Sequence, residues 1–542
     1  MLTRVGDEHN GRFVRETLAA EGVDVSQVRT DPKRLTALVF LGIRDHDTFP
    51  LVFYRDHCAD MGLCVDDVDA AFIASAHALL ISGTHLSQPQ TYEACVAAMQ
   101  AARAAGTRVV LDIDYRPVLW GLTSPGLGEQ RYVRSDRVSE HLQTVLPLCD
   151  LIVGTEEEVH IAGGSPESLA ALRRIRELSN ALIVMKRGPM GCVAFPAAIP
   201  ERVDDGAAGP GFPVEVFNVL GAGDAFMAGL LRGWVRDEPL ANALRYANAC
   251  GALVVSRHGC APAMPSWIEL SHFLAHGSLT TRLREDVLLE RIHRATTRTR
   301  RWPSLAVLAF DHRSQFDELA RSHGANGERI AAFKQLVADA AQRGYADAQR
   351  DIGGAAALPS RGVIVDGRFG GALLPRLTGH GGWVARPVEV PGSRPLAFEA
   401  ADGLWAELRS WPAEHVVKCL LSHDPDDDAA LAARQLATLA TLARACHTTG
   451  HELLVEVIPP TEARSDARTL ARALAQVYEA GVFPDWWKLP PPDGDAAWRE
   501  IAAVIGVHDP HCRGVLLLGL GAAEAELAES FRVAATQPIC KG

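Results

Sequence analysis

The sequence predicts a protein of the α/β class, with a doubly wound α/β domain followed by a (β/α)8 barrel. Its 542 residues are too many for one ordinary domain. Short apolar segments alternate with amphipathic helical segments along nearly the whole chain, a pattern typical of parallel sheets covered by helices. An arginine-rich stretch, residues 277–302, separates two halves that both show this alternation.

Composition narrows the classes of function. The chain is 48% hydrophobic and 22% charged, with a formal net charge of -12. This acidic balance argues against nucleic acid as a partner and favours an enzyme that acts on small molecules. No apolar run reaches membrane-spanning length and no signal-peptide core opens the chain, so we expect no membrane partner. Eleven cysteines without a CxxC pair favour a reducing, cytoplasmic environment.

The first half, residues 1–276, is predicted to form one domain with a mainly parallel sheet. Helical patterns at 90–105 and 167–178 lie between its apolar segments. The candidate strands are 36–41, 78–82, 108–113, 151–153, 181–186 and 214–219.

A glycine-rich turn, Gly221-Ala222-Gly223-Asp224, follows the last of these strands and opens an apolar helical stretch. Glycines let the backbone approach a ligand closely, and the free N–H groups at a helix start favour phosphate. An acid here would repel phosphate, but it can take a proton from a hydroxyl while the amides hold the transferred phosphoryl group. The alternative is that Asp224 is only an N-terminal cap.

A second polar group ends the strand at 108–113. Asp112, Asp114 and Arg116 alternate and therefore share one face. At the carboxyl end of a parallel strand, two acids and an arginine suit sugar hydroxyls and a carboxylate or phosphate. A surface salt-bridge cluster is the alternative.

Residues 217–227 resemble the C-terminal signature of the PfkB/ribokinase family of sugar kinases. The resemblance implies a ribokinase-like fold, with ATP and Mg²⁺ as cofactors. It also implies that Asp224 is the catalytic base and that the amides of residues 221–223 form an anion hole. Residues 112–120 are similar to the sugar-binding stretch of ketodeoxygluconate-type kinases, with Asp114 where those kinases carry Asn.

The same resemblance assigns residues around the nucleotide. Thr155 and Glu158 stand in the Asn-x-x-Glu motif that organises Mg²⁺ and phosphates, and Glu158 retains the carboxylate that a hard cation prefers. Taken alone, glutamates at a helix start would only stabilise the helix dipole. For Asn248, a buried structural role is the alternative. The further nucleotide-binding positions are Lys186, Gly188, Gly191 and Asn248.

Family members usually carry a first strand with a substrate-binding acid, and a Gly-Gly hinge, upstream of the motif that here opens the chain at residues 2–11. We therefore expect the N-terminal part of the kinase domain to be missing. An alternative to catalysis follows from this expectation, namely a sugar- or nucleotide-binding scaffold.

Residues 277–302 hold seven arginines and few strongly apolar residues. This composition predicts a solvated linker helix. The lack of interleaved aromatic residues argues against a nucleic-acid-binding patch.

The second half, residues 303–542, has the size of a TIM barrel. Helical patterns at 429–446 and 467–480 lie between its strands, and the chain ends inside the expected last strand. The candidate strands are 305–310, 362–365, 383–388, 416–421, 453–458, 485–489, 515–518 and 538–540.

Polar side chains follow or end several of these strands, where barrels place catalysis. Two lysines and a glutamate in apolar strands are costly unless they pair or act chemically. A lysine desolvated beside another cation has a lowered pKa and can attack a ketone as a free amine. A buried structural Lys–Glu pair is the alternative. The polar residues are Asp311, Asp366, Arg368, Lys418, Glu456 and Lys488.

Residues 310–313 and 417–421, together with Glu456 and Lys488, resemble the class I aldolases of the tagatose-bisphosphate type. The resemblance implies a Schiff-base lysine at Lys488, with Lys418 and Glu456 beside it, and no metal in this half. From their position at or near strand ends, Asp311, Asp366 and Arg368 are expected to contact the substrate.

Together, the two halves resemble bacterial bifunctional proteins of inositol catabolism that join a 5-dehydro-2-deoxygluconate kinase to an aldolase. The resemblance implies phosphorylation of the 6-hydroxyl of this sugar acid and cleavage of its phosphate to dihydroxyacetone phosphate and malonate semialdehyde. An alternative is a kinase for another keto-sugar acid, such as 2-keto-3-deoxygluconate, joined to a barrel of different activity. The oligomeric state stays open, with a homo-oligomer among the options.

Overall fold

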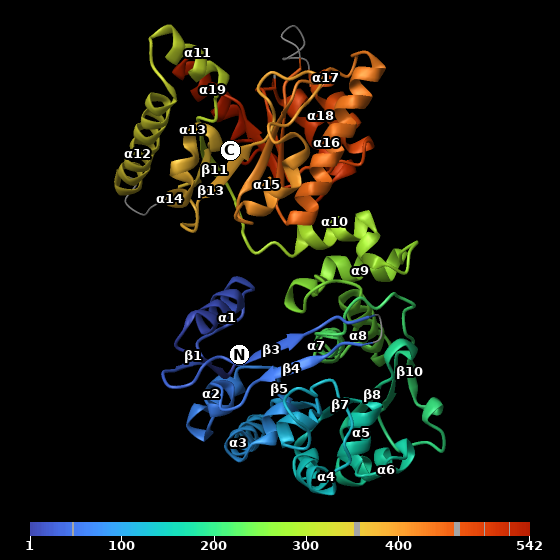
Figure 1. Ribbon diagram of the computed structural model, residues 1–542. Coiled ribbons are helices and arrows are strands. Elements are labelled where there is room, and N and C mark those ends of the chain that lie inside the picture. The colour runs from blue at the N-terminus through green and yellow to red at the C-terminus, as the bar shows by residue number, and fades with distance from the viewer. Residues whose placement is uncertain (46–47, 352–357, 460–466, 493, 520) are drawn as a thin grey trace. The chain divides into compact units, whose positions relative to one another are not determined.

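A computed structural model describes residues 1–45, 48–351, 358–459, 467–492, 494–519 and 521–542. The described chain divides into two compact units, Met1–Thr299 and Arg300–Gly542, each of which is treated by itself (Figure 1). No helix within these ranges is long and apolar enough to cross a membrane.

The first unit is built on a six-stranded sheet with the order β10-β9-β8-β7-β6-β5. Strands β5 to β8 are parallel, and β9 and β10 extend one edge in antiparallel fashion. The sequence located β5–β8 to within two residues but did not predict β9 or β10. The bounds are β5 Ala78–Ser82, β6 Arg108–Asp112, β7 Leu151–Thr155, β8 Leu182–Lys186, β9 Cys192–Phe195 and β10 Ala207–Gly209.

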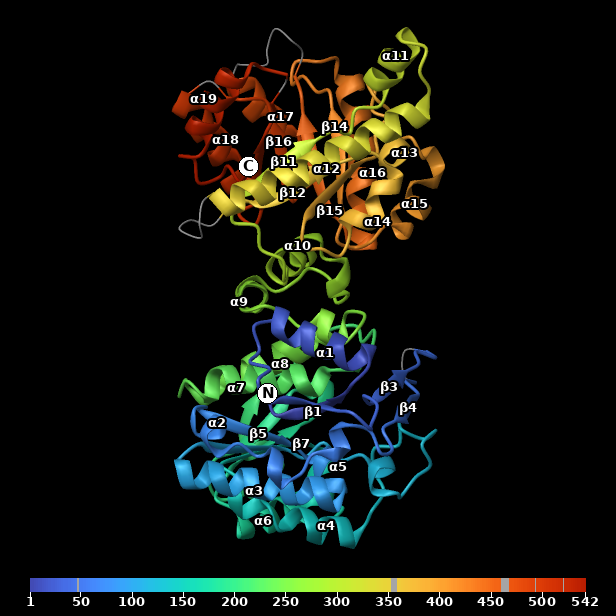
Figure 2. The same cartoon turned by 90° about the vertical axis from the view of Figure 1, so that its left-hand side faces the viewer.

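Helices cover both faces of this sheet. Val109 and Leu111 of β6 pack with residues of α3–α6, whereas Val110 packs with residues of α7 and α8. Figure 2 shows α3, α4 and α6 on one side of the sheet and α7 and α8 on the other. The period-two alternation of strand side chains thus builds two cores. The helices are α3 Pro89–Ala105, α4 Asp136–Gln143, α5 Glu156–Gly163, α6 Ser168–Leu178, α7 Ala222–Trp234 and α8 Leu240–Val255.

Two small sheets complete the first unit. Strand β1 (Thr3–Gly6) pairs in parallel with β2 (Val28–Asp31), and β3 (Leu38–Leu41) forms an antiparallel hairpin with β4 (Leu51–Tyr54). Only β3 was predicted. The remaining helices are α1 His9–Ala20, α2 Ala70–Ala74, α9 Trp267–His276 and α10 Val287–Thr296.

Two predictions for the first unit were wrong. Residues 214–219 are not a strand, because the N–H groups of Phe217 and Asn218 donate to the carbonyl of Val255, 2.7 and 3.1 Å away, at the end of α8. Residues 277–302 contain a helix, α10, as predicted, but this helix is not simply solvated, because its Leu289 and Ile292 are buried. In both segments apolar side chains pack against neighbouring helices.

The second unit contains a seven-stranded, wholly parallel sheet in the order β11-β12-β13-β14-β15-β16-β17. All seven strands lie within two residues of their predicted positions, because buried parallel strands form continuous apolar runs. The bounds are β11 Leu305–Ala309, β12 Ser360–Ile364, β13 Trp383–Pro387, β14 Val416–Leu421, β15 Glu452–Val457, β16 Trp486–Leu489 and β17 Gly514–Leu517.

The sheet curves into a half-barrel with an inner and an outer apolar layer. The inner layer includes Trp383, Leu454 and Trp486, and the outer layer packs β14–β17 against α15–α19. The helices are α11 Ser314–Ser322, α12 Gly327–Asp351, α13 Gly367–Gly370, α14 Leu374–Leu377, α15 Leu404–Ser410, α16 Ala429–Thr449, α17 Ala467–Glu479, α18 Gly494–His508 and α19 Glu524–Ala534.

The predicted eighth strand, 538–540, is not a strand but a single parallel bridge between Cys540 and Val515. The residues that follow it bond to both outer strands. Leu517 N–H donates to the carbonyl of Gly542 at 2.7 Å, and Leu305 N–H donates to that of Lys541 at 2.6 Å. The end of the chain therefore lies between β17 and β11.

Candidate functional site

The Gly221–Asp224 turn starts α7 as predicted. Gly221 has a φ of +82° and immediately precedes the helix, so the helix cap is Gly221 and not Asp224. A Cβ atom at Gly221 would lie 2.5 Å from the sulfur of Cys260, which also excludes larger residues. No described side chain caps this helix start, which leaves its amides available to an anion.

Asn218 holds the turn, although the sequence did not point to it. Its side chain is buried, its Nδ2 donates to the carbonyl of Arg257 at 2.7 Å, and its Oδ1 accepts from Leu220 N–H at 2.7 Å. The only signal in the sequence was an amide within an otherwise apolar run. Asn218 therefore fixes the backbone directly before Gly221.

Asp224 lies in the first turn of α7 and is accessible to solvent. Partial burial by the surrounding protein raises its pKa, and the nearby carboxylate of Asp114 adds to this effect. The cations Lys186 and Arg116 oppose the rise in pKa. An aspartate with a raised pKa is a better proton acceptor than an ordinary one.

The predicted residues at the ends of β6, β7 and β8 form one charged cluster. Lys186 Nζ lies 3.2 Å from Asp112 Oδ1 and 3.9 Å from Glu158 Oε2. Arg116 contacts Asp114 at 2.5 Å and Glu158 at 3.7 Å. Burial raises the pKa of Asp112 to about 7, with Lys186 opposing and Glu158 adding to the rise.

Lys186 connects this cluster to the glycine turn. A Cβ atom at Gly223 would lie 3.7 Å from Lys186 Nζ. Burial disfavours the ammonium, but Asp112 and Glu158 more than compensate and raise the pKa of Lys186. The structure thus brings a charged lysine, free amides and Asp224 together.

The other predicted nucleotide residues have structural partners. Thr155 and Glu158 form a capping box at the start of α5, with Thr155 N–H donating to Glu158 at 2.7 Å. Gly188 and Gly191 lie in a tight turn after β8, and Gly191 abuts residues 209–211. The buried amide of Asn248 donates to the carbonyl of Gly209 at 3.0 Å, which matches the structural alternative for this residue.

A polar chain that the sequence did not predict joins the β3–β4 hairpin to Asp114. Arg55, directly after β4, contacts Asp60 at 2.6 Å and Thr84 at 3.4 Å. Ser82 bridges Thr84 at 2.9 Å and Asp114 at 3.1 Å. These residues are far apart in sequence, so no local motif could reveal that their side chains are linked.

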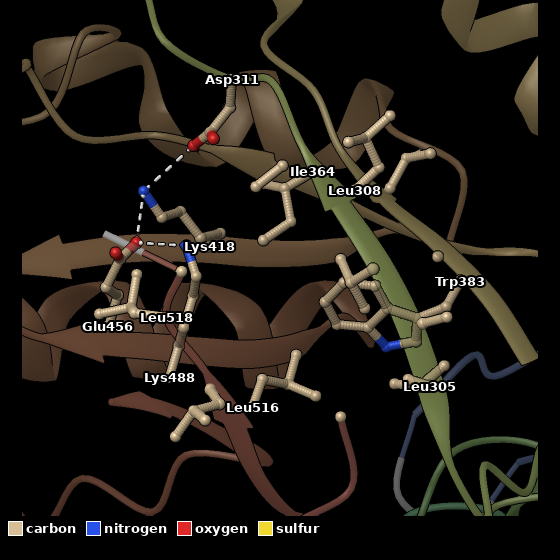
Figure 3. A pocket seen from close by; sticks show the side chains of 18 of the residues that line it. Leu305, Leu308, Asp311, Ile364, Trp383, Lys418, Glu456, Lys488, Leu516 and Leu518 are labelled. Carbon is tan, nitrogen blue, oxygen red and sulfur yellow. Dashed lines mark hydrogen bonds and ion pairs between the residues drawn. The ribbon is translucent and has the colours of Figure 1, made fainter. Parts of the chain in front are cut away.

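Four predicted residues of the second unit meet at the carboxyl ends of its strands. Lys418 Nζ lies 3.1 Å from Asp311 and 2.9 Å from Glu456, and Lys488 Nζ lies 3.2 Å from the same Glu456 oxygen. Figure 3 shows these side chains pointing toward one another, with Trp383 farther along the pocket. They line a cavity of about 2090 Å³.

Glu389, after β13, is a fifth member that the sequence did not reveal. Its Oε1 lies 3.4 Å from Lys418 and 2.8 Å from Arg313, and its Oε2 accepts from Leu420 N–H at 3.1 Å. Arg313 also contacts Glu399 at 2.9 Å. Lys418 therefore faces three carboxylates.

These carboxylates determine the charge of Lys418. Burial alone would lower the pKa of Lys418, but Glu456, Glu389 and Asp311 raise it well above its ordinary value. The same ion pairs, opposing burial, lower the pKa of Glu456 and Asp311. Lys418 is therefore held as an ammonium ion and is not a free amine.

Asp366 and Arg368, which were predicted to contact the substrate, do not belong to this cluster. Asp366 is fully buried and pairs with Lys334 of α12. Arg368 is exposed and pairs with Asp317 at 2.9 Å. Neither lines the cavity, because both side chains leave the rim of the sheet toward the outer helices.

Two family models match different parts of the chain. Residues 1–267 match the pfkB family carbohydrate kinase. Residues 269–542 match DUF2090, described as an uncharacterized protein conserved in bacteria.

Relatives with 5-dehydro-2-deoxygluconokinase as their name match the first half. The protein of Geobacillus kaustophilus (strain HTA426) is 31% identical over 278 residues, which are 50% of this chain and 78% of the relative. That of Shouchella clausii (strain KSM-K16) is 32% identical over 273 residues, 49% of this chain and 78% of the relative. A solved PfkB protein from Polaromonas sp. JS666 is 28% identical, covers 46% of this chain and 77% of its own, and has a TM-score of 0.38. The chain belongs to the pfkB family of carbohydrate kinases through its first half and to the family DUF2090 through its second half.

Proposed function

We propose that the first unit transfers the γ-phosphoryl group of ATP to the 6-hydroxyl of 5-dehydro-2-deoxygluconate. The observation that carries this proposal is the meeting of Asp224, the uncapped amides of α7 and Lys186 at one point. These groups are a base, an anion site and a cation, the parts that phosphoryl transfer requires. The names of the relatives support the choice of sugar acid.

In the proposed reaction, Asp224 takes the proton of the 6-hydroxyl as its oxygen attacks the γ-phosphorus. The bond from phosphorus to the β–γ bridging oxygen breaks, and ADP leaves. The amides of α7 and the Lys186 ammonium stabilise the negative charge of the phosphoryl group in transit. The raised pKa of Asp224 assists the proton transfer.

The polar chain of the β3–β4 hairpin supplies contacts for a sugar acid. Asp114 can accept hydrogen bonds from sugar hydroxyls, and the guanidinium groups of Arg116 and Arg55 can bind a carboxylate. Burial and the neighbouring Arg55 lower the pKa of His85 to about 4, so its imidazole is neutral. We assign sugar recognition to this side of the cluster.

The acidic cluster also suits Mg²⁺ that arrives with ATP. The carboxylates of Asp112, Asp114, Glu158 and Asp224 outnumber the nearby cations Lys186 and Arg116. The described residues contain no ready group of three metal ligands, so an ion would rely on Glu158, water and phosphate oxygens, as Mg²⁺ often does. When bound, Mg²⁺ neutralises charge on the β- and γ-phosphates.

The pH dependence of the kinase tests the role of Asp224. A base must be ionised, so kcat should fall as the pH drops through the pKa of Asp224. Asp114 raises this pKa and Lys186 lowers it, so Asp114→Asn should move the acid limb to lower pH and Lys186→Met to higher pH. The measurement is kcat from about pH 4 to 9 at saturating substrates.

The pKa of Asp112 responds to the same neighbours, so a control is needed. If Asp224 is the base, the fall of kcat at low pH must disappear from the residual activity of Asp224→Asn. Unshifted limbs in both variants would contradict the assignment.

We further propose that the second unit has the (β/α)8 architecture, with residues 538–542 in the position of the eighth strand, and that it cleaves the phosphorylated product by aldol chemistry. The bonds of Lys541 and Gly542 to β11 and β17 support this architecture. The cleavage is favoured by two lysines that share Glu456 at the carboxyl ends of the strands and face a cavity. Lys488 contacts one carboxylate and Lys418 three, which favours Lys488 as the amine.

The proposed cleavage proceeds through a covalent intermediate on Lys488. The Lys488 amine condenses with the ketone at carbon 5, which takes up one proton and loses water to give an iminium ion. Glu456 takes the proton of the hydroxyl at carbon 3, the bond between carbons 3 and 4 breaks, and its electrons pass to the iminium ion. Malonate semialdehyde leaves, and protonation and hydrolysis of the enamine release dihydroxyacetone phosphate.

The kinase proposal is tested by Mg²⁺-dependent ADP formation with a panel of keto-sugar acids. A different preferred acid would favour the alternative substrate class. ATP binding without turnover would favour a binding scaffold.

A further inference from the structure

We propose that Lys334 is a positioning residue that holds Asp311 against Lys418. Lys334 lies on α12, and its side chain is fully buried. Its Nζ donates to the carbonyl of Phe310 at 2.8 Å, to the carbonyl of His312 at 2.9 Å and to the carboxylate of Asp366. An ammonium group has three N–H donors, and all three are used here.

The two carbonyls belong to the residues on either side of Asp311. Lys334 therefore fixes the backbone before and after Asp311, at the end of β11. Asp311 then places its Oδ2 3.1 Å from Lys418 Nζ. A lysine that served only to neutralise Asp366 would not need to bind both carbonyls.

This arrangement has a chemical consequence for Lys418. The ammonium faces Asp311 after β11, Glu389 after β13 and Glu456 of β15, and Glu456 also contacts Lys488 of β16. If Asp311 moves away, two carboxylates remain and Lys418 loses its proton more readily. Lys334 thus keeps Lys418 protonated, which leaves Lys488 as the amine. Only this last assignment rests on the proposed aldol cleavage.

The test is the labelling of Lys418 by acetic anhydride as a function of pH, mapped by peptide mass spectrometry on the full chain. Lys334→Met/Asp366→Asn removes both buried charges together, so no carboxylate is left unpaired. Asp366→Asn alone is the matched control, because it retains both carbonyl bonds of Lys334. Asp311→Asn is the reference for complete loss of the Asp311 charge.

We expect the labelling midpoint of Lys418 to fall by about one pH unit or more in the double variant and in Asp311→Asn. It should stay at the wild-type value in Asp366→Asn. If circular dichroism shows that the first double variant does not fold, it is replaced by a second one, Lys334→Met/Asp366→Leu. This variant exchanges the ion pair for apolar groups. A folded double variant with the wild-type midpoint would overturn the proposal, as would an unshifted Asp311→Asn.

The labelling needs no turnover. A barrel without aldolase activity would contradict the proposed cleavage but would leave this result unaffected. A shifted midpoint in an active barrel would support both proposals.

Discussion

Asp224→Asn lowers the kcat of the kinase reaction by about 10²–10⁴-fold, the usual contribution of a positioned general base. Asn has nearly the same shape but cannot accept the proton of the 6-hydroxyl. Asp224 does not cap α7, because Gly221 occupies that position, so the variant should retain its fold. The measurement is steady-state ADP formation together with ATP binding by calorimetry.

The matched control is Asp136→Asn, which changes an exposed aspartate paired with Arg134 on the surface of the same unit. It should leave kcat within about twofold of the wild type, since surface pairs contribute little. Turnover by Asp224→Asn at the rate of this control would remove Asp224 from the mechanism.

Borohydride reduction in the presence of the phosphorylated keto acid should attach the substrate covalently to Lys488. The reason is that an iminium ion, once reduced, becomes a stable secondary amine. Peptide mapping should locate the added mass on the β16 peptide that contains Lys488. Lys488→Met should abolish both trapping and cleavage.

Lys418→Leu is the variant to compare with Lys488→Met, because three carboxylates hold Lys418 as an ammonium ion. It should slow cleavage while trapping on Lys488 persists. An adduct on Lys418 would exchange the roles of the two lysines. If no adduct forms and a metal chelator abolishes the cleavage, the second unit is a metal-dependent aldolase instead.

The parallel strands of the two large sheets could be predicted because each is a short apolar run bounded by polar or glycine-rich residues. The same signal failed at 214–219, where Val214 packs against helices in an irregular segment. Apolar character alone does not distinguish a strand from a buried loop. The β9–β10 extension was missed because its antiparallel pairing depends on contacts that one segment cannot reveal.

The sequence likewise pointed to some residues of the candidate sites and not to others. Asp224 and the residues from Asp112 to Arg116 lie in short motifs whose spacing carries the chemistry. Glu389 and Asn218 were missed because each acts through a partner distant in sequence or through the backbone. Asp366 follows a strand end as an active-site residue would, but position along a strand does not determine which way the next side chain turns.

The rate of ADP formation with a panel of sugar acids tests the central claim most directly. The panel compares 5-dehydro-2-deoxygluconate with 2-keto-3-deoxygluconate at equal Mg²⁺ and ATP, with Asp224→Asn as the blank. We expect kcat/KM to be at least about tenfold higher for 5-dehydro-2-deoxygluconate, because a site built for one set of hydroxyl groups leaves polar groups unpaired with another. Equal or reversed preference would contradict the assigned substrate, and binding of ATP without any turnover would contradict the kinase itself.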